Sequence, residues 1–248
     1  MRRIVTVFLS LVMLLSCTMA FAATTEKGPL PQFMNAVEGS WCDQNGHRMV
    51  VFGDYMMNGI RVSEANNVSG DQLNGSATIT IIGRTGVDFV NVYWNTVAGK
   101  RTINMGGSMP MVPFAAAPQY PETVGGLHLD MTEPELSNKY GPGTLLTPSE
   151  TMALCGINAE SWYYKDIGLL ATFDQQTFTV DRLILVKGAT TAFDISALNA
   201  DSPLYKYAAI YGWSYTPAPG DVVDMGHGQS MNFKYYPQAV MIQLSSLN

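Results

Sequence analysis

The segment 128–141 (HLDMTEPELSNKYG) concentrates side chains whose types could do chemistry. Its histidine is His128 and its carboxylates are Asp130, Glu133 and Glu135, with Glu122 just upstream. A histidine and a carboxylate two residues apart at a strand end can chelate a metal ion, and paired carboxylates are the acid and base of glycoside hydrolysis. Two hypotheses follow: a metal or catalytic cluster, or the polar start of a helix.

The same segment carries the signals of a helix start. Thr132 is a favourable N-cap, and Glu135, three residues later, completes a capping box. The proline between them suits the first turn, where its missing N–H costs little, and acidic side chains stabilise the positive end of the helix dipole. A helix over 133–140 therefore accounts for the glutamates and leaves only His128 and Asp130 unexplained.

Other chemical motifs are sparse. The histidines are His47, His128 and His227, and no two of them lie at i, i+4 or form an HExxH motif. A zinc site built from two of them is the alternative to solvated or hydrogen-bonded histidine. Residues 228–232 lack the last glycine of a nucleophile elbow. We therefore predict no catalytic, cofactor-binding or metal residues, and no cofactor.

Residues 1–22 have the pattern of a secretory signal peptide. Two arginines precede an apolar run, and Ala20-Phe21-Ala22 fits the cleavage rule. The run is too short to span a bilayer, which takes roughly 20 residues. In the alternative interpretation 14–17 is a lipobox, and Cys17 carries a lipid anchor. Both interpretations predict a bacterial-type protein that is secreted or attached to the cell envelope, without a transmembrane span.

The composition is that of a globular, acidic protein. Hydrophobic residues make up 47% and charged residues 14% of the chain. Cleavage after Ala22 would remove two arginines and take the net charge from -6 to -8. This charge argues against nucleic acid or an anionic membrane as a partner. The partner that we expect is a protein or another envelope component.

Two cysteines, Cys42 and Cys155, would remain after cleavage. In an oxidising compartment they could form a disulfide across a long loop, worth about 4–5 kcal/mol in the chain-entropy account. Two buried thiols are the alternative, and the spacing does not decide between them.

Residues 33–107 have the pattern of an antiparallel all-β domain. Three Asn-Gly pairs favour type I′ turns, and the strands that we expect are 41–44, 47–52, 55–57, 60–64, 77–82, 87–94 and 101–105. These strands predict a meander, a sandwich or a small barrel. Gly39-Ser40-Trp41 resembles the Gly-x-Trp motif of lipocalin-type barrels, which would imply a small apolar ligand inside this domain. Residues 108–126, rich in proline and glycine, are predicted to be a linker without regular structure.

Beyond the linker, 127–188 and 189–248 each combine helix signals with strand signals. The first half adds a second helix, 148–155, with the capping box Thr147/Glu150, and the strands 162–166, 168–174 and 177–186. The second half has a helix over 203–211, capped by Asp201 or Ser202, and the strands 228–235 and 238–244. We interpret the halves as tandem helix-plus-sheet repeats, and the fold class as α+β.

The first repeat carries a recognisable set of residues, namely Leu129, Met131, Thr132, Glu135, Leu136, Tyr140, Gly141, Gly168, Leu169, Thr172, Phe173, Asp174, Val180, Asp181, Arg182 and Leu183. In this pattern the C-terminal half resembles small envelope lipoproteins of the SmpA/OmlA class and the β-lactamase inhibitory protein family. Asp130 departs from the glycine usual at that place. The resemblance implies tandem helix-plus-sheet units and an interaction or scaffold role without catalysis. The alternatives are a secreted hydrolase with a site between the β-domain and the repeats, and the apolar-ligand binder.

Overall fold

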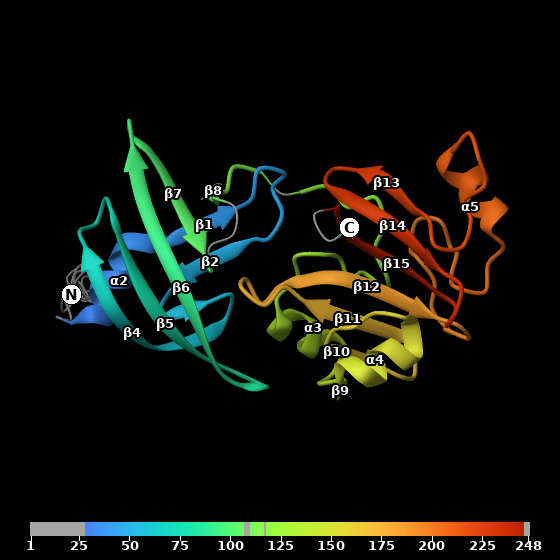
Figure 1. Ribbon diagram of the computed structural model, residues 1–248, viewed down its shortest axis with the longest axis horizontal. Helices are drawn as coiled ribbons and strands as arrows, with labels where there is room; N and C mark the ends of the chain where they lie inside the picture. Colours follow the sequence, from blue (N-terminus) through green and yellow to red (C-terminus); the bar gives the residue numbers. More distant parts are fainter. Residues whose placement is uncertain (1–27, 107–109, 117, 246–248) are drawn as a thin grey trace, which may run out of the picture.

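The structure is a computed structural model that describes residues 28–106, 110–116 and 118–245. The predicted signal peptide and Cys17 lie outside these residues. Within them, four helices and two antiparallel sheets form two lobes, which lie side by side in Figure 1. The α+β class is therefore confirmed, with strands predominating. Across the described ranges, no helix is long and apolar enough to cross a membrane.

The N-terminal lobe is one helix packed on a curled sheet. Its elements are α2 (Pro29–Val37), β1 (Gly39–Cys42), β2 (Val50–Gly53), β3 (Met56–Met57), β4 (Ile60–Gly70), β5 (Gly75–Gly83), β6 (Gly86–Val97), β7 (Lys100–Met105) and β8 (Val112–Pro113). The strand order is β7-β6-β5-β4-β3-β2-β1-β8. Ile103 and Met111 exchange both backbone hydrogen bonds, at 3.0 and 2.7 Å, and so bring the two outer edges of the sheet together.

The N-terminal lobe differs from prediction in two segments. Residues 33–37, expected to be β-structure, belong to α2. Their apolar side chains fill the inside of the sheet, where Phe33 lies edge-on to Phe52 and to Trp94. The binding of a small apolar ligand in this lobe stays a prediction. The predicted linker was wrong in part, because Val112–Pro113 pairs with β1 as strand β8.

The C-terminal lobe contains the other three described helices and one sheet. Its elements are α3 (Glu133–Tyr140), β9 (Thr144–Leu146), α4 (Pro148–Cys155), β10 (Ser161–Tyr164), β11 (Leu169–Phe173), β12 (Val180–Val186), α5 (Leu204–Tyr211), β13 (Val222–Gly226), β14 (Gln229–Lys234) and β15 (Ala239–Leu244). Strands β12 and β15 pair, so 127–188 and 189–248 share one sheet in the order β13-β14-β15-β12-β11-β10-β9. Their internal duplication stays a prediction.

The structure tests the helix caps that the sequence predicts. Both predicted capping boxes are present, at Thr132 with Glu135 and at Thr147 with Glu150. The predicted cap of α5 was wrong. Pro203 is its N-cap residue, without a side-chain bond. The hydroxyl of Ser202 instead bonds Asn199, so it is not available to the helix.

Phe33 provides a test of the N-terminal core. Its side chain is fully buried, and Phe33→Ala should lower the free energy of unfolding by about 3–5 kcal/mol. Phe89→Ala is the matched control, because that ring is 69% exposed and its loss should change little. Urea unfolding of both variants measures the difference. Equal effects would contradict this account of the core.

Candidate functional site

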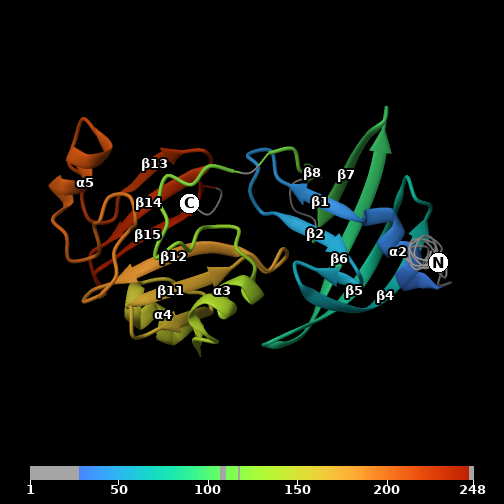
Figure 2. The ribbon, with the colours of Figure 1, turned by 180° about the vertical axis from the view of Figure 1, so that it is seen from behind.

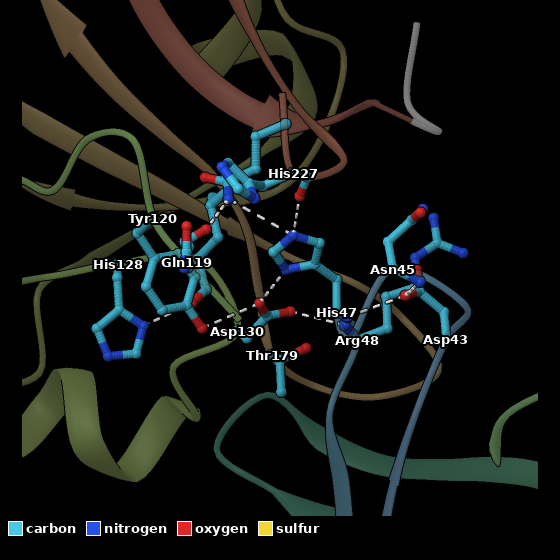
Figure 3. Close-up of polar contacts among 12 residues, drawn as sticks. Asp43, Asn45, His47, Arg48, Gln119, Tyr120, His128, Asp130, Thr179 and His227 are labelled. Carbon is cyan, nitrogen blue, oxygen red and sulfur yellow. Dashed lines mark hydrogen bonds and ion pairs between the residues drawn. The ribbon is translucent and has the colours of Figure 1, made fainter. Parts of the chain in front are cut away.

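A buried polar junction joins the two lobes and brings three distant segments together (Figure 3). His47 comes from the loop between β1 and β2, Asp130 from the turn before α3, and His227 from the turn between β13 and β14. The side chains of His47 and Asp130 are each only 1% exposed. The junction is therefore a part of the interior to which all three segments contribute.

Both nitrogens of the His47 ring are engaged by acceptors. Nδ1 lies 2.6 Å from Oδ2 of Asp130, and Nε2 lies 2.5 Å from the carbonyl oxygen of His227. A carbonyl oxygen only accepts, so Nε2 must carry a proton, and a carboxylate partner favours a proton on Nδ1. The geometry therefore describes an imidazolium ion held between a carboxylate and a carbonyl group.

Asp130 accepts further hydrogen bonds that suit its ionised form. The backbone N–H of Arg48 donates to Oδ1 at 2.7 Å, and the Tyr120 hydroxyl donates to Oδ2 at 3.1 Å. The ring of His128 stacks on Tyr120, with 4.3 Å between centroids. With three donors around one carboxylate, the negative charge is well compensated despite its burial.

The backbone at the junction is locally strained. Arg48, Asp130 and His227 have φ values of 55°, 67° and 53°, in the left-handed region. This conformation costs L-residues roughly 1–2 kcal/mol each, and aspartate and histidine enter it more readily than most. The carboxylate of Asp43 supports the loop by accepting the N–H groups of Asn45 and His47 at 2.8 and 2.9 Å.

The electrostatics of the junction favour the charged histidine. Burial lowers the pKa of His47, but the hydrogen bond and charge of Asp130, with the carbonyl of His227, outweigh it and leave the pKa raised. Burial and the neighbouring Asp130 raise the pKa of Tyr120. The ion pair is shut off from solvent, so it offers no reacting group to a substrate. It joins residues of the two lobes.

The structure separates the residues that the sequence had grouped in 122–135. His128 and Asp130 do not form a chelating pair, because Nδ1 of His128 donates to the carbonyl of Leu129 at 2.6 Å. Glu122 is fully buried and accepts the N–H groups of 195 and 196 and the Tyr211 hydroxyl. Glu135 caps α3 as expected.

The thiols are not reactive groups either. Cys42 and Cys155 are both free and buried, so the alternative of two buried thiols holds and the disulfide does not form. Burial raises the pKa of Cys42 and raises that of Cys155 to about 11, so neither is a thiolate at neutral pH. Among the residues that the structure describes, no group of three metal-binding side chains could hold an ion.

An open cleft of about 420 Å³ lies between the lobes beside this junction. Acidic and aromatic side chains dominate its lining, notably Asp88, Phe89, Glu133, Glu160, Trp162 and Asp174. They come from β6, the start of α3, strand β10 and its preceding residue, and the residue after β11. No local signal in the sequence marks this cleft, because it forms only when the β5–β6 hairpin and the end of β11 meet.

Two arginines partly compensate the carboxylates of the cleft. Arg84 Nε lies 3.0 Å from Glu133, and its guanidinium stacks 4.0 Å from the centroid of the Trp162 ring. Arg48 lies 3.6 Å from Asp174. Burial raises the pKa of Glu133, although the charge of Arg84 opposes this shift. Asp88 and Glu160 have no cation partner within the described residues.

Comparisons with protein-family models, with curated proteins and with solved structures found nothing that matches this chain. Function is therefore inferred from the geometry and the exposed surfaces of the structure.

The ion pair should be more important to stability than the other polar groups around it. His47→Ala would leave Asp130 buried without its counter-charge, and we expect a loss of about 3–5 kcal/mol in the free energy of unfolding. Adding Asp130→Asn should restore part of this loss, because it removes the uncompensated charge. His128→Ala, measured by the same denaturant titration, serves as the control. A double variant no more stable than His47→Ala alone would contradict this prediction.

The raised pKa of His47 also predicts a pH dependence. The folded state binds the proton more tightly than the unfolded chain, whose histidine titrates near about 6.5. The stabilisation is therefore complete below that pH and is lost as the pH rises through the folded-state pKa. The stability difference between the unmodified protein and His47→Gln should shrink over that interval. A difference that grows with pH would show the opposite sign of linkage.

Proposed function

We propose that this chain is a non-catalytic interaction protein, secreted or attached to the cell envelope, that binds a protein partner through the N-terminal sheet. The observation that carries the proposal is the outer side of β6. Four apolar side chains lie along this side, and their exposed fractions are 57% for Val87, 69% for Phe89, 50% for Tyr93 and 65% for Val97. Ile82, paired with Val87 across β5 and β6, is 51% exposed.

The outer face of an antiparallel sheet is normally the polar one. On β6 the inward residues Val90, Val92 and Trp94 already complete the core, so the outward apolar groups add nothing to folding that the structure displays. Clustered exposed apolar and aromatic side chains mark surfaces that bind other proteins. The export pattern of 1–22 and the resemblance of the C-terminal half to envelope proteins support the location and the scaffold role within this proposal.

A double substitution on β6 tests the proposal. Phe89→Arg with Tyr93→Arg should abolish partner capture from the native envelope after chemical cross-linking, and should leave the melting temperature nearly unchanged because both rings are exposed. Tyr236→Arg is the matched control, since that ring is 93% exposed on the other lobe. Equal capture by the unmodified protein, the double variant and the Tyr236→Arg variant would refute a role for β6.

Mass spectrometry of the mature N-terminus distinguishes Cys17 from Ala23 as its first residue.

A hydrolase acting in the interlobe cleft is the second candidate. The cleft brings several carboxylates together, and Glu133 has the raised pKa that a general acid needs. Arg84, however, holds the Glu133 carboxylate at 3.0 Å and favours its ionised form, which is why we place binding first. Turnover of fluorogenic glycosides that Glu133→Gln abolishes would establish the hydrolase instead.

A further inference from the structure

We propose that the interlobe cleft binds an extended basic segment of the partner protein, in which arginine or lysine alternates with apolar residues. This inference rests on the proposed function and names the chemistry of the segment that is recognised. The cleft adjoins the outer face of β6, and Phe89 belongs to both surfaces.

Two residues that line the cleft already bind a cationic side chain of the protein itself. Arg84 lies between the ring of Trp162 and the carboxylate of Glu133, and its guanidinium also donates to Ser137 Oγ at 2.8 Å and to the carbonyl of Pro142 at 2.7 Å. An aromatic face beside a carboxylate is a favourable environment for a guanidinium group. The cleft is therefore built from the groups that recognise arginine.

Carboxylates remain for further cations beyond Arg84. Asp88 and Glu160 line the cleft, and within the described part of the chain neither side chain has an ion pair or a hydrogen bond. Glu160 is exposed and Asp88 half-buried, so both are open to an incoming side chain. A basic segment would complement this charge, and the net charge of the chain, -6, would attract it from a distance.

The walls and the shape of the cleft favour an extended segment. Leu145 and Phe89, 42% and 69% exposed, offer apolar contact, and Phe178 lines the same space. A second hollow of about 340 Å³, which Arg48 and Arg182 also line, shares Phe173, Asp174 and Gln175 with the cleft at the end of β11. An open cleft with both charged and apolar walls suits an extended chain, whose successive side chains point to opposite sides.

The test uses fluorescein-labelled peptides and the full chain. A peptide of alternating arginine and valine should bind, as measured by fluorescence anisotropy, more tightly than a peptide of alternating glutamate and valine, and added salt should weaken it. Asp88→Asn with Glu160→Gln should weaken binding roughly tenfold, equivalent to about 1.4 kcal/mol. Glu38→Gln with Asp166→Asn, which removes the same charge from exposed sites outside the cleft, should have little effect.

Defined outcomes would overturn the inference. It fails if the arginine and glutamate peptides bind equally, if neither binds, or if both double variants weaken binding to the same extent. Leu145→Lys gives an independent check, because it places a cation on an exposed wall and should also reduce binding of the arginine peptide. Capture of the native partner separates the two proposals. If the Asp88/Glu160 variant retains full capture, the cleft inference fails and the proposed function stands; if the unmodified protein captures nothing, the proposed function itself fails.

Discussion

The buried ion pair of His47 and Asp130 is the interaction on which the arrangement of the lobes depends. A buried pair adds little net stability over a well-packed apolar contact, but loss of one partner leaves a charge that the interior cannot solvate. The imidazolium needs both Asp130 and the His227 carbonyl at hydrogen-bond distance. Three separate segments must therefore keep fixed positions relative to one another. This polar contact fixes the position of one sheet relative to the other.

Other interlobe contacts extend this constraint toward the cleft. The loop between β11 and β12 reaches the N-terminal lobe, visible from behind in Figure 2, where the Asn58 amide donates to the Thr177 carbonyl at 2.6 Å. Phe178, on the same loop, packs against the N-terminal core with a φ of 56°. Arg84, at the tip of the β5–β6 hairpin, bonds residues around α3. The cleft lies between this loop and this hairpin, so its shape follows from how both are anchored.

The sequence was sufficient to predict the features whose determining interactions are short in range. Thr132 and Thr147 cap their helices through residues three positions away, and Asn58-Gly59 turns the chain with positive φ at both positions. It failed where distant segments decide. Helix α2 lacks a side-chain cap that could be recognised in the sequence, and it is held in place by core packing. The pair of His47 with Asp130 spans 83 residues, and its single trace in the sequence was that no helix signal explained Asp130.

The outward side of β6 and the cleft both contain side chains that the packing of the described residues leaves exposed or unpaired. Folding accounts for the inward residues of β6, for the caps and for the junction, all of which have partners inside the protein. It does not account for the exposed ring of Phe89, nor for the carboxylates of Asp88 and Glu160, which have no cation partner among the residues that the structure describes. These groups are adjacent, and they are of opposite character, apolar and anionic. A partner segment that combines apolar and cationic side chains is the one chemistry that would satisfy both at once.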